Sequence, residues 1–137
     1  MSVALDAIYA TAAALTSPLW LFRLLRTGKW QTDWPARFGR CGPVEDGAGP
    51  RLLIHAVSVG EVNAVRMLVE QLRASTDFRI VISTTTDTGL ARARGLFEPA
   101  IRVERYPLDF SGSVRRFLDA VRPDVVALTE LEIWPNF

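Results

Sequence analysis

The stretch that decides the fold is Arg51-Leu-Leu-Ile-His-Ala-Val-Ser-Val-Gly-Glu61, a buried strand that breaks at Gly60 and opens onto a helix. Polar groups (His55, Ser58 and Glu61) lie in and just after the strand, at the carboxyl end where open α/β sheets bind ligands. Glu61 is therefore either an acid–base candidate or a helix-capping carboxylate, which the helix dipole also favours. Helical spacing gives the following helix one apolar face, formed by Val62, Val65, Leu68, Val69 and Leu72.

A second apolar strand delivers carboxylates at the end of the chain. In Asp124-Val-Val-Ala-Leu-Thr-Glu-Leu-Glu-Ile-Trp-Pro-Asn136, Glu130 and Glu132 come where the buried run finishes. Because the carboxyl ends of parallel strands share an edge, we expect Glu61 and Glu130 to face one crevice. Two acids in one cleft suit general base catalysis, with one ionised and its neighbour tuned or ion-paired. The alternative is that Glu130 and Glu132 cap a following helix or pair with an Arg.

The chain between these two strands alternates strands with helices. Residues 78–83 and 101–106 are predicted strands, and Ser111 or Ser113 is predicted to cap a helix with one apolar face. This alternation implies an α/β fold with a mostly parallel, Rossmann-like sheet wound right-handedly. No Gly-x-Gly-x-x-Gly follows the first strand, which argues against dinucleotide binding.

A hydroxyl-rich turn, Thr84-Thr-Thr-Asp-Thr-Gly89, follows the second strand. Hydroxyls and free N–H groups at a helix start can cradle a sugar or a phosphate, which makes Thr85, Thr88 and Gly89 candidate binding residues. An ordinary N-cap at Asp87 or Thr88 explains the same pattern.

The amino-terminal segment is first apolar and then basic. No residue from Ala7 to Phe22 is charged; this run of 16 residues is shorter than the roughly 20 that a spanning helix needs, although flanking apolar residues extend it. No Lys or Arg precedes the run, so an uncleaved anchor that spans the membrane or lies in its interface is favoured over a signal peptide, although Ala12-Ala-Ala14 looks cleavable. The positive flank places the rest of the chain in the cytoplasm. Five basic residues are candidates for headgroup contact, or an ordinary solvated flank: Arg23, Arg26, Lys29, Arg37 and Arg40.

The composition of the chain argues against several other classes of protein. A formal net charge of +1 gives no argument for nucleic acid, and one Cys with one His offers neither a disulfide framework nor a metal-ligand cluster. We expect an apolar anchor helix in residues 1–25 and a basic juxtamembrane segment in residues 26–50. The Gly- and Pro-containing stretch 41–50 is expected to be a loop that separates the anchor region from a Rossmann-like domain in residues 51–137.

Four strings of this sequence resemble one family in order and spacing: His55-Ala-Val-Ser-Val-Gly-Glu61, Ser83-Thr-Thr-Thr-Asp-Thr-Gly89, Tyr106-Pro-Leu-Asp109 and Glu130-Leu-Glu-Ile-Trp-Pro-Asn136. The chain is similar to the amino-terminal half of the 3-deoxy-D-manno-octulosonic acid (Kdo) transferases. A Gly-Glu pair that is usual there is Pro35-Ala36 here.

The resemblance implies a glycosyltransferase of two Rossmann domains, of which this chain is the incomplete acceptor half. Such an enzyme moves Kdo from CMP-Kdo to lipid A in lipopolysaccharide core biosynthesis, at the cytoplasmic face of the inner membrane. It needs no metal or other cofactor, and a separate carboxyl-terminal domain binds CMP-Kdo. We therefore expect this part alone to be inactive. The resemblance makes Glu61 the general base and Glu130 a stabiliser of charge. The candidate substrate-binding residues beside them are His55, Ser58, Gly60, Thr85, Thr88, Gly89 and Glu132.

Two non-catalytic alternatives stay open from the sequence. One is a membrane-anchored module that binds a lipid A precursor without transferring anything. The other is an unrelated Rossmann-like interaction domain in which Glu61 and Glu130 are structural caps.

Overall fold

The computed structural model describes residues 3–27, 32–45 and 47–137. Within these residues four strands form one sheet in the order β3-β2-β1-β4, and every neighbouring pair is parallel. The sequence prediction of a Rossmann-like parallel sheet is confirmed. The strands are β1 (Arg51–His55), β2 (Arg79–Thr84), β3 (Arg102–Arg105) and β4 (Val125–Leu128).

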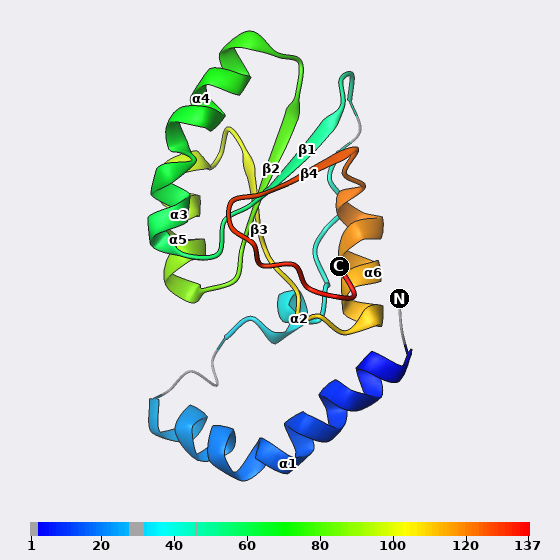
Figure 1. Ribbon diagram of the computed structural model, residues 1–137. Coiled ribbons are helices and arrows are strands. Elements are labelled where there is room, and N and C mark those ends of the chain that lie inside the picture. The colour runs from blue at the N-terminus through cyan, green and yellow to red at the C-terminus, as the bar shows by residue number, and fades with distance from the viewer. Residues whose placement is uncertain (1–2, 28–31, 46) are drawn as a thin grey trace.

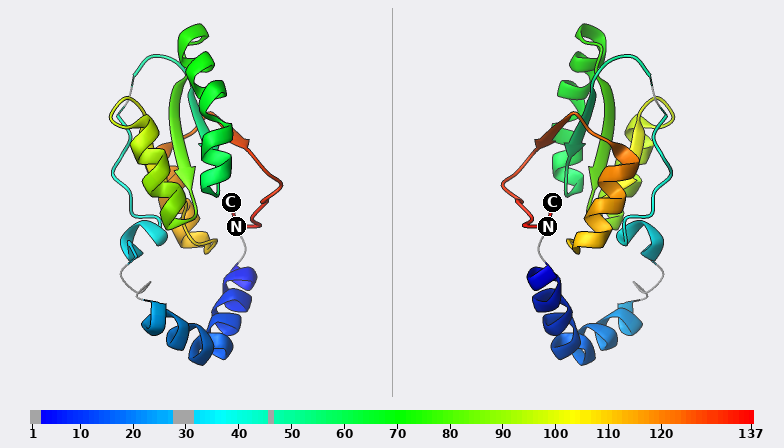
Figure 2. Two further views of the ribbon diagram at one scale, coloured as in Figure 1. Left: turned by 90° about the vertical axis from the view of Figure 1, so that its left-hand side faces the viewer. Right: turned by 90° about the vertical axis from the view of Figure 1, so that its right-hand side faces the viewer.

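Helices cover both faces of the sheet (Figures 1 and 2). On one face lie α3 (Val59–Ala64), α4 (Arg66–Ser75) and α5 (Asp87–Phe97), and on the other lies α6 (Ser111–Val121). Parallel neighbours need a crossover connection, and these helices supply it. The carboxyl ends of the strands all point toward the long amino-terminal helix.

Successive residues of β1, an inner strand of the sheet, belong to two separate hydrophobic cores on its opposite faces. Leu52 and Ile54 pack with α3, α4 and α5, whereas Leu53 packs with Phe117 and Val121 of α6. Every residue of β1 is buried, because the strand has helices on both sides. This two-sided burial explains the continuous apolar run in the sequence.

The structure corrects three details of the sequence prediction. The single helix expected after Gly60 is two helices that meet at Val65, and the change of direction leaves Leu68 49% exposed instead of on the buried face. The last strand is not a buried run: β4 lies at an edge of the sheet in the described residues, and Val125 and Val126 are exposed there. Neither predicted serine caps α6, because Phe110 holds the N-cap position and makes no side-chain cap bond.

The stretch 41–50, expected to be a loop, has no helix or strand in its described residues, and it packs against the domain. After the short helix α2 (Trp34–Arg37), Gly39 has a φ of +76°, and a Cβ there would lie 2.0 Å from the carbonyl oxygen of Ser113. The N–H of Val44 donates to the carbonyl of Ala120 at 3.1 Å. Residues 39–44 therefore pack on α6 as part of the fold.

The amino-terminal helix α1 (Val3–Thr27) crosses below the carboxyl edge of the sheet (Figure 1). Its first 21 residues, Val3–Arg23, are long and apolar enough to cross a membrane by length and composition, and none of this stretch is buried. The expected apolar amino-terminal helix is present.

Candidate functional site

Glu61 lies at the carboxyl edge of the sheet, where β1 gives way to α3. Its Oε2 accepts hydrogen bonds from the N–H of Val57 at 2.8 Å and from the hydroxyl of Thr129 at 2.7 Å. Its Oε1 accepts from the hydroxyl of Ser58 at 2.8 Å and from the Ser58 N–H at 3.2 Å. Four donors from two strand ends thus fix one half-buried carboxylate.

The capping interpretation of Glu61 holds, but it is incomplete. Ser58 and Glu61 form a reciprocal capping box at the start of α3, with Glu61 at the third helical position. A capping box accounts for the bonds with Ser58. It does not account for Thr129, which comes from the far end of the chain and joins the β1 and β4 ends through this carboxylate.

The surroundings keep Glu61 ionised. Burial raises the pKa of its carboxyl, but the hydrogen bonds from Thr129, Val57 and Ser58 act in the opposite direction and hold the pKa below the usual 4.5. The Thr129 hydroxyl also lies 3.0 Å from the carbonyl oxygen of His55. Because a hydroxyl has a single proton, Thr129 can donate to Glu61 or to that carbonyl, but not to both.

His55 is 2% exposed and faces the α6 side of the sheet. Its Nδ1 lies 2.9 Å from the Ser83 hydroxyl, and its ring packs on Tyr106 with centroids 4.1 Å apart. Burial lowers the pKa of His55 to about 4, although its contact with Ser83 and the charge of Glu61 oppose the shift, so the ring is neutral at pH 7. The structure places this predicted substrate contact inside the core, where the ring supports the sheet.

The turn after β2 is organised by Thr86 and not by the residues named from the sequence. Thr86, rather than Asp87 or Thr88, is the N-cap of α5, since its hydroxyl accepts the N–H of Gly89 at 3.0 Å. A Cβ on Gly89 would lie 2.7 Å from that hydroxyl and 3.1 Å from the Val57 carbonyl, so only glycine fits. Thr88 is exposed, and the buried Thr85 hydroxyl has no hydrogen-bond partner among the described residues.

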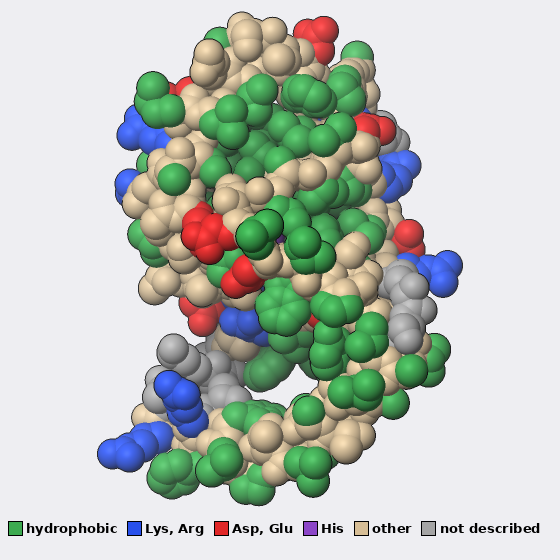
Figure 3. Space-filling model, in the orientation of Figure 1, with side chains coloured by type: hydrophobic (Ala, Val, Ile, Leu, Met, Phe, Trp, Pro, Cys, Tyr) green, Lys and Arg blue, Asp and Glu red, His purple; other side chains and the backbone are tan. Residues whose placement is uncertain are grey.

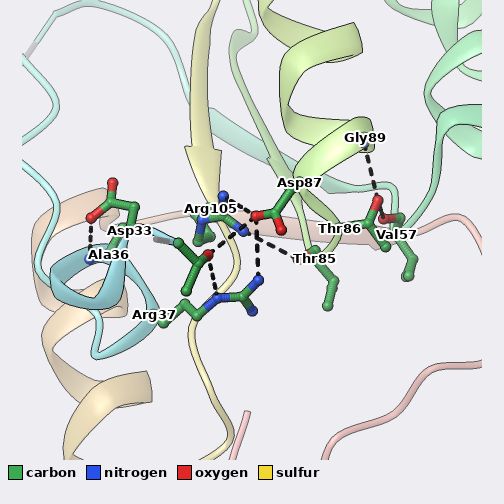
Figure 4. A network of polar contacts seen from close by, with 10 residues as sticks. Asp33, Ala36, Arg37, Val57, Thr85, Thr86, Asp87, Gly89 and Arg105 are labelled. Atoms are coloured by element: carbon green, nitrogen blue, oxygen red, sulfur yellow. Dashed lines mark hydrogen bonds and ion pairs between the residues drawn. The ribbon is translucent and has the colours of Figure 1, made fainter. Parts of the chain in front are cut away.

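Beside this turn two arginines converge on one carboxylate (Figure 4). Nη2 of Arg105 lies 2.7 Å from Oδ1 of Asp87, and Nη2 of Arg37 lies 3.4 Å from the same oxygen. Thr32 completes the cluster, because its hydroxyl accepts from Nε of Arg37 at 2.9 Å. Burial raises the pKa of Asp87, but its bonds with Arg105 prevail and lower it. The cluster carries one net positive charge and ties α2 to the carboxyl edge.

The acids of the last segment follow Thr129, the residue that donates to Glu61 from the end of β4. Glu130 directly follows Thr129 and is exposed, and half-buried Glu132 accepts the indole N–H of Trp134 at 3.3 Å. No Arg or Lys of the described residues pairs with either acid.

Gly60 is exposed in the first turn of α3, beside Glu61. No three His, Cys, Asp or Glu side chains of the described residues form a metal-binding group.

The basic residues expected at the membrane have different environments. Arg23 and Arg26 are exposed in the last turns of α1, and Arg40 is exposed after α2. Arg37 is turned inward to Asp87, with 19% of its side chain exposed. Lys29 lies outside the described residues.

Sequence reasoning missed the residues that hold the site together. Thr129, Thr86 and Arg105 each follow or end a strand, so their position at the carboxyl edge was visible in the sequence. Their partners were not, because Thr129 and Glu61 are 68 residues apart and Arg105 and Asp87 are 18 apart.

The fold and this edge define a class of protein: a Rossmann-like α/β domain that presents an ordered carboxylate at the carboxyl edge of a parallel sheet, where open α/β sheets in general bind ligands. Residues 32–137 match the profile of the family described as 3-deoxy-D-manno-octulosonic-acid transferase (kdotransferase). The chain belongs to the Kdo transferase family.

Individual relatives agree with this assignment. The chain is 37% identical over 141 residues to the 3-deoxy-D-manno-octulosonic acid transferase of Bordetella pertussis, covering 94% of the chain and 32% of the relative. It is 31% identical to the Chlamydia trachomatis serovar D enzyme of that name, covering 96% of the chain and 31% of the relative, and 36% identical to the Haemophilus influenzae one, covering 82% and 26%. The chain thus spans about a third of the length of the curated relatives it matches. No solved structure matches it.

Proposed function

We propose that this chain is the acceptor domain of a membrane-associated glycosyltransferase that moves Kdo from CMP-Kdo to lipid A in lipopolysaccharide core biosynthesis. The observation that supports this most is Glu61, a half-buried and ionised carboxylate held by four donors at the ligand-binding edge in a chain of this family. A carboxylate so fixed is suited to receive a proton from a substrate hydroxyl.

In the proposed reaction a hydroxyl of the acceptor attacks the anomeric carbon of Kdo. A new carbon–oxygen bond forms, the bond to the phosphate of CMP breaks, and CMP leaves with the electron pair. The hydroxyl proton passes to Oε2 of Glu61. Thr129 makes room for this step, because its hydroxyl can turn to the His55 carbonyl 3.0 Å away and free Oε2 for the incoming hydroxyl. Loss of that donated bond raises the pKa of Glu61 and makes it a stronger base.

The neighbouring residues have proposed roles that follow from their places. Glu130, exposed beside Thr129, stabilises charge that develops during transfer. Ser58 positions Glu61 through the capping box. Gly60, Thr88 and Glu132, which are exposed or half-buried, line the route by which the acceptor sugar approaches.

The proposed location is the cytoplasmic face of the inner membrane. Lipid A is a membrane lipid, and the carboxyl edge that carries Glu61 faces α1, the apolar helix (Figure 1). Figure 3 shows an opening between α1 and the domain, so the helix does not seal this edge. Exposed Arg23 and Arg26 at the end of α1 suit the phosphates of lipid headgroups.

CMP-Kdo is proposed to bind a second domain that corresponds to the remaining two thirds of the relatives. Transfer between two bound substrates needs both held at near-attack distance, an orientation that accounts for several kcal/mol of the barrier. This part alone is therefore expected to be inactive.

Three preparations test the proposal: the 137-residue chain, the chain joined to the remaining carboxyl-terminal part of the Bordetella pertussis relative, and that fusion carrying Glu61→Gln. Each is assayed in detergent with lipid A precursor and labelled CMP-Kdo. We expect no incorporation from the chain, incorporation from the fusion, and at least roughly 100-fold less from Glu61→Gln. Glu70→Gln, at an exposed position of α4, is the matched control and should retain full activity.

The outcomes separate the alternatives. Full activity of the folded Glu61→Gln fusion refutes Glu61 as the base. Incorporation by the chain alone refutes the need for a second domain. Binding of the lipid A precursor by a fusion that never transfers Kdo identifies a binding module in place of an enzyme.

A further inference from the structure

The amino end of α1 is fastened to the folded domain by side-chain hydrogen bonds. Asp6 accepts both the backbone N–H of Ser111, at 2.8 Å, and the Ser111 hydroxyl, and so caps α6 from outside that helix. Asn136 donates to Asp6 at 3.3 Å, and the Tyr9 hydroxyl donates to Asp109 at 3.2 Å. Asp6 is a charged residue beside an apolar run, where a charge is unfavourable in a membrane. In this structure it supplies the cap that neither Ser111 nor Ser113 provides.

The other end of α1 is held on the same side by the covalent chain. Thr27 ends the helix, and Thr32, five residues later, is already bound to Arg37 and Asp87 at the domain. Five residues reach at most about 18 Å, which is well short of the roughly 30 Å of a hydrocarbon core. The carboxyl end of α1 therefore cannot lie across a bilayer from the domain.

Between these two ends α1 is bent, as Figures 1 and 2 both show, with its two arms rising toward the domain. Pro18 lacks an N–H and leaves the carbonyl of Ala14 without its helical donor. The Ser17 hydroxyl donates to that carbonyl at 2.8 Å, and the Trp20 indole N–H donates to the Ala13 carbonyl at 3.0 Å. These side chains supply hydrogen bonds to backbone carbonyls at the bend. A bent helix in an apolar medium needs such bonds, because no water is there to supply them.

The surface of α1 is apolar and uncovered. Leu15 and Leu19, on either side of Pro18 in the sequence, are 78% and 76% exposed. Val3–Arg23 is long enough to cross a membrane, but its uncharged part, Ala7–Phe22, is 16 residues, or about 24 Å of helix. A spanning arrangement would therefore draw the charged Asp6 toward the roughly 30 Å hydrocarbon core. Figure 3 shows apolar side chains along the free edge of this helix.

We infer that α1 is a re-entrant anchor that dips into one leaflet of a bilayer and returns, with both ends on the side of the domain. The inference rests on the membrane attachment proposed above, and it replaces the spanning arrangement, one of the two that the sequence left open, with a helix that stays in one leaflet. Burial of Leu15 and Leu19 in the leaflet supplies the attachment, and the Asp6–Ser111 bonds hold the carboxyl edge facing the lipid.

Cysteine accessibility in liposomes of phosphatidylethanolamine and phosphatidylglycerol tests this arrangement. In a Cys41→Ser background, single cysteines replace Ala4, Arg26 and Ser75, which mark the start of α1, its end and the domain. A membrane-impermeant maleimide is added to proteoliposomes before and after permeabilisation. We expect all three cysteines to react before permeabilisation to the same extent, in vesicles where the Ser75 marker faces outward.

Two results would contradict the account, and they are distinguishable. Reaction at the Ala4 position only after permeabilisation, with the Ser75 position already labelled, shows a spanning helix and overturns the inference alone. Recovery of the chain free of vesicles in flotation overturns the membrane attachment itself.

The capping of α6 by Asp6 has its own test. Asp6→Ala should lower the unfolding temperature of the domain by several degrees, whereas Asp77→Ala, in an exposed loop, should not. Equal effects of the two substitutions would show that Asp6 does not cap α6.

Discussion

Replacing Glu61 by Gln tests the hydrogen-bond network at the carboxyl edge through stability, independently of activity. The side chains are nearly the same size, so no cavity forms. The carboxylate accepts from four donors, but the Gln amide has one acceptor oxygen and turns its NH₂ toward two of them. Hydrogen bonds to a charged group contribute roughly 1.5–3 kcal/mol each, and the hydroxyls of Ser58 and Thr129 can turn away in compensation. We therefore expect a loss of about 2 kcal/mol in the free energy of unfolding at pH 7, or roughly 8 °C in melting temperature.

The pH dependence of this loss has a defined sign. The pKa of Glu61 is lowered in the folded state from about 4.5, so its stabilising contribution is complete above pH 4.5 and disappears as the pH falls through the folded pKa. Urea unfolding of the chain and the Glu61→Gln variant, followed by tryptophan fluorescence, should show the full difference at pH 7 and a smaller one near pH 3. Glu70→Gln, which loses only an exposed pair with Arg66, should cost roughly 0.3–0.5 kcal/mol. A Glu61→Gln effect no larger than that of the control, or one independent of pH, would refute the reasoning.

Three further predictions concern single residues. In the fusion protein, Thr129→Val should raise the pKa of Glu61 and move the acid limb of the kcat/KM profile to higher pH, and Thr129→Ser should restore it; an unmoved limb in the valine variant would remove Thr129 as a positioning residue. His55 is the one histidine of the chain, so its ring signal in a proton NMR titration should give a pKa of about 4, and a value near 6.5 would contradict its burial. Its folded pKa is depressed, so it opposes folding as the pH falls below about 6.5. Gly89→Ala should destabilise the fold by more than 1 kcal/mol, since the added Cβ would lie 2.7 Å from a threonine hydroxyl, whereas Gly95→Ala, with open space around it, should be neutral or stabilising; equal melting temperatures would contradict the packing.

Periodicity and strand–helix alternation predicted the sheet because those signals are local. The run through Leu53 and Ile54 is apolar on both faces, and a parallel central strand requires that. The edge position of β4 was not predicted, because its apolar run looks the same whether or not neighbours cover it. Burial of such a strand depends on what lies beside it in space, and the sequence of the strand does not contain this.

The sequence predicted where the candidate site lies, but not which residues form its hydrogen bonds and ion pairs. Glu61 was identified from its position after a strand, and the capping box that also explains it is a local pattern. The Thr129 bond, the Arg105–Asp87 pair and the capping of α6 by Asp6 join residues between 18 and 105 positions apart. Contacts of that range depend on the packed fold, since no local propensity encodes them.

Binding of the acceptor at the carboxyl edge is the most direct test of the proposed role. The ¹⁵N-labelled chain in detergent micelles is titrated with lipid A precursor, and amide shifts are mapped against identical micelles without the lipid. We predict shifts concentrated at Ser58, Gly60 and Thr88, with Gly49 and Ser75 at the opposite end of the sheet unchanged. Shifts confined to that opposite end, or no shifts at saturating precursor, would contradict an acceptor site beside Glu61.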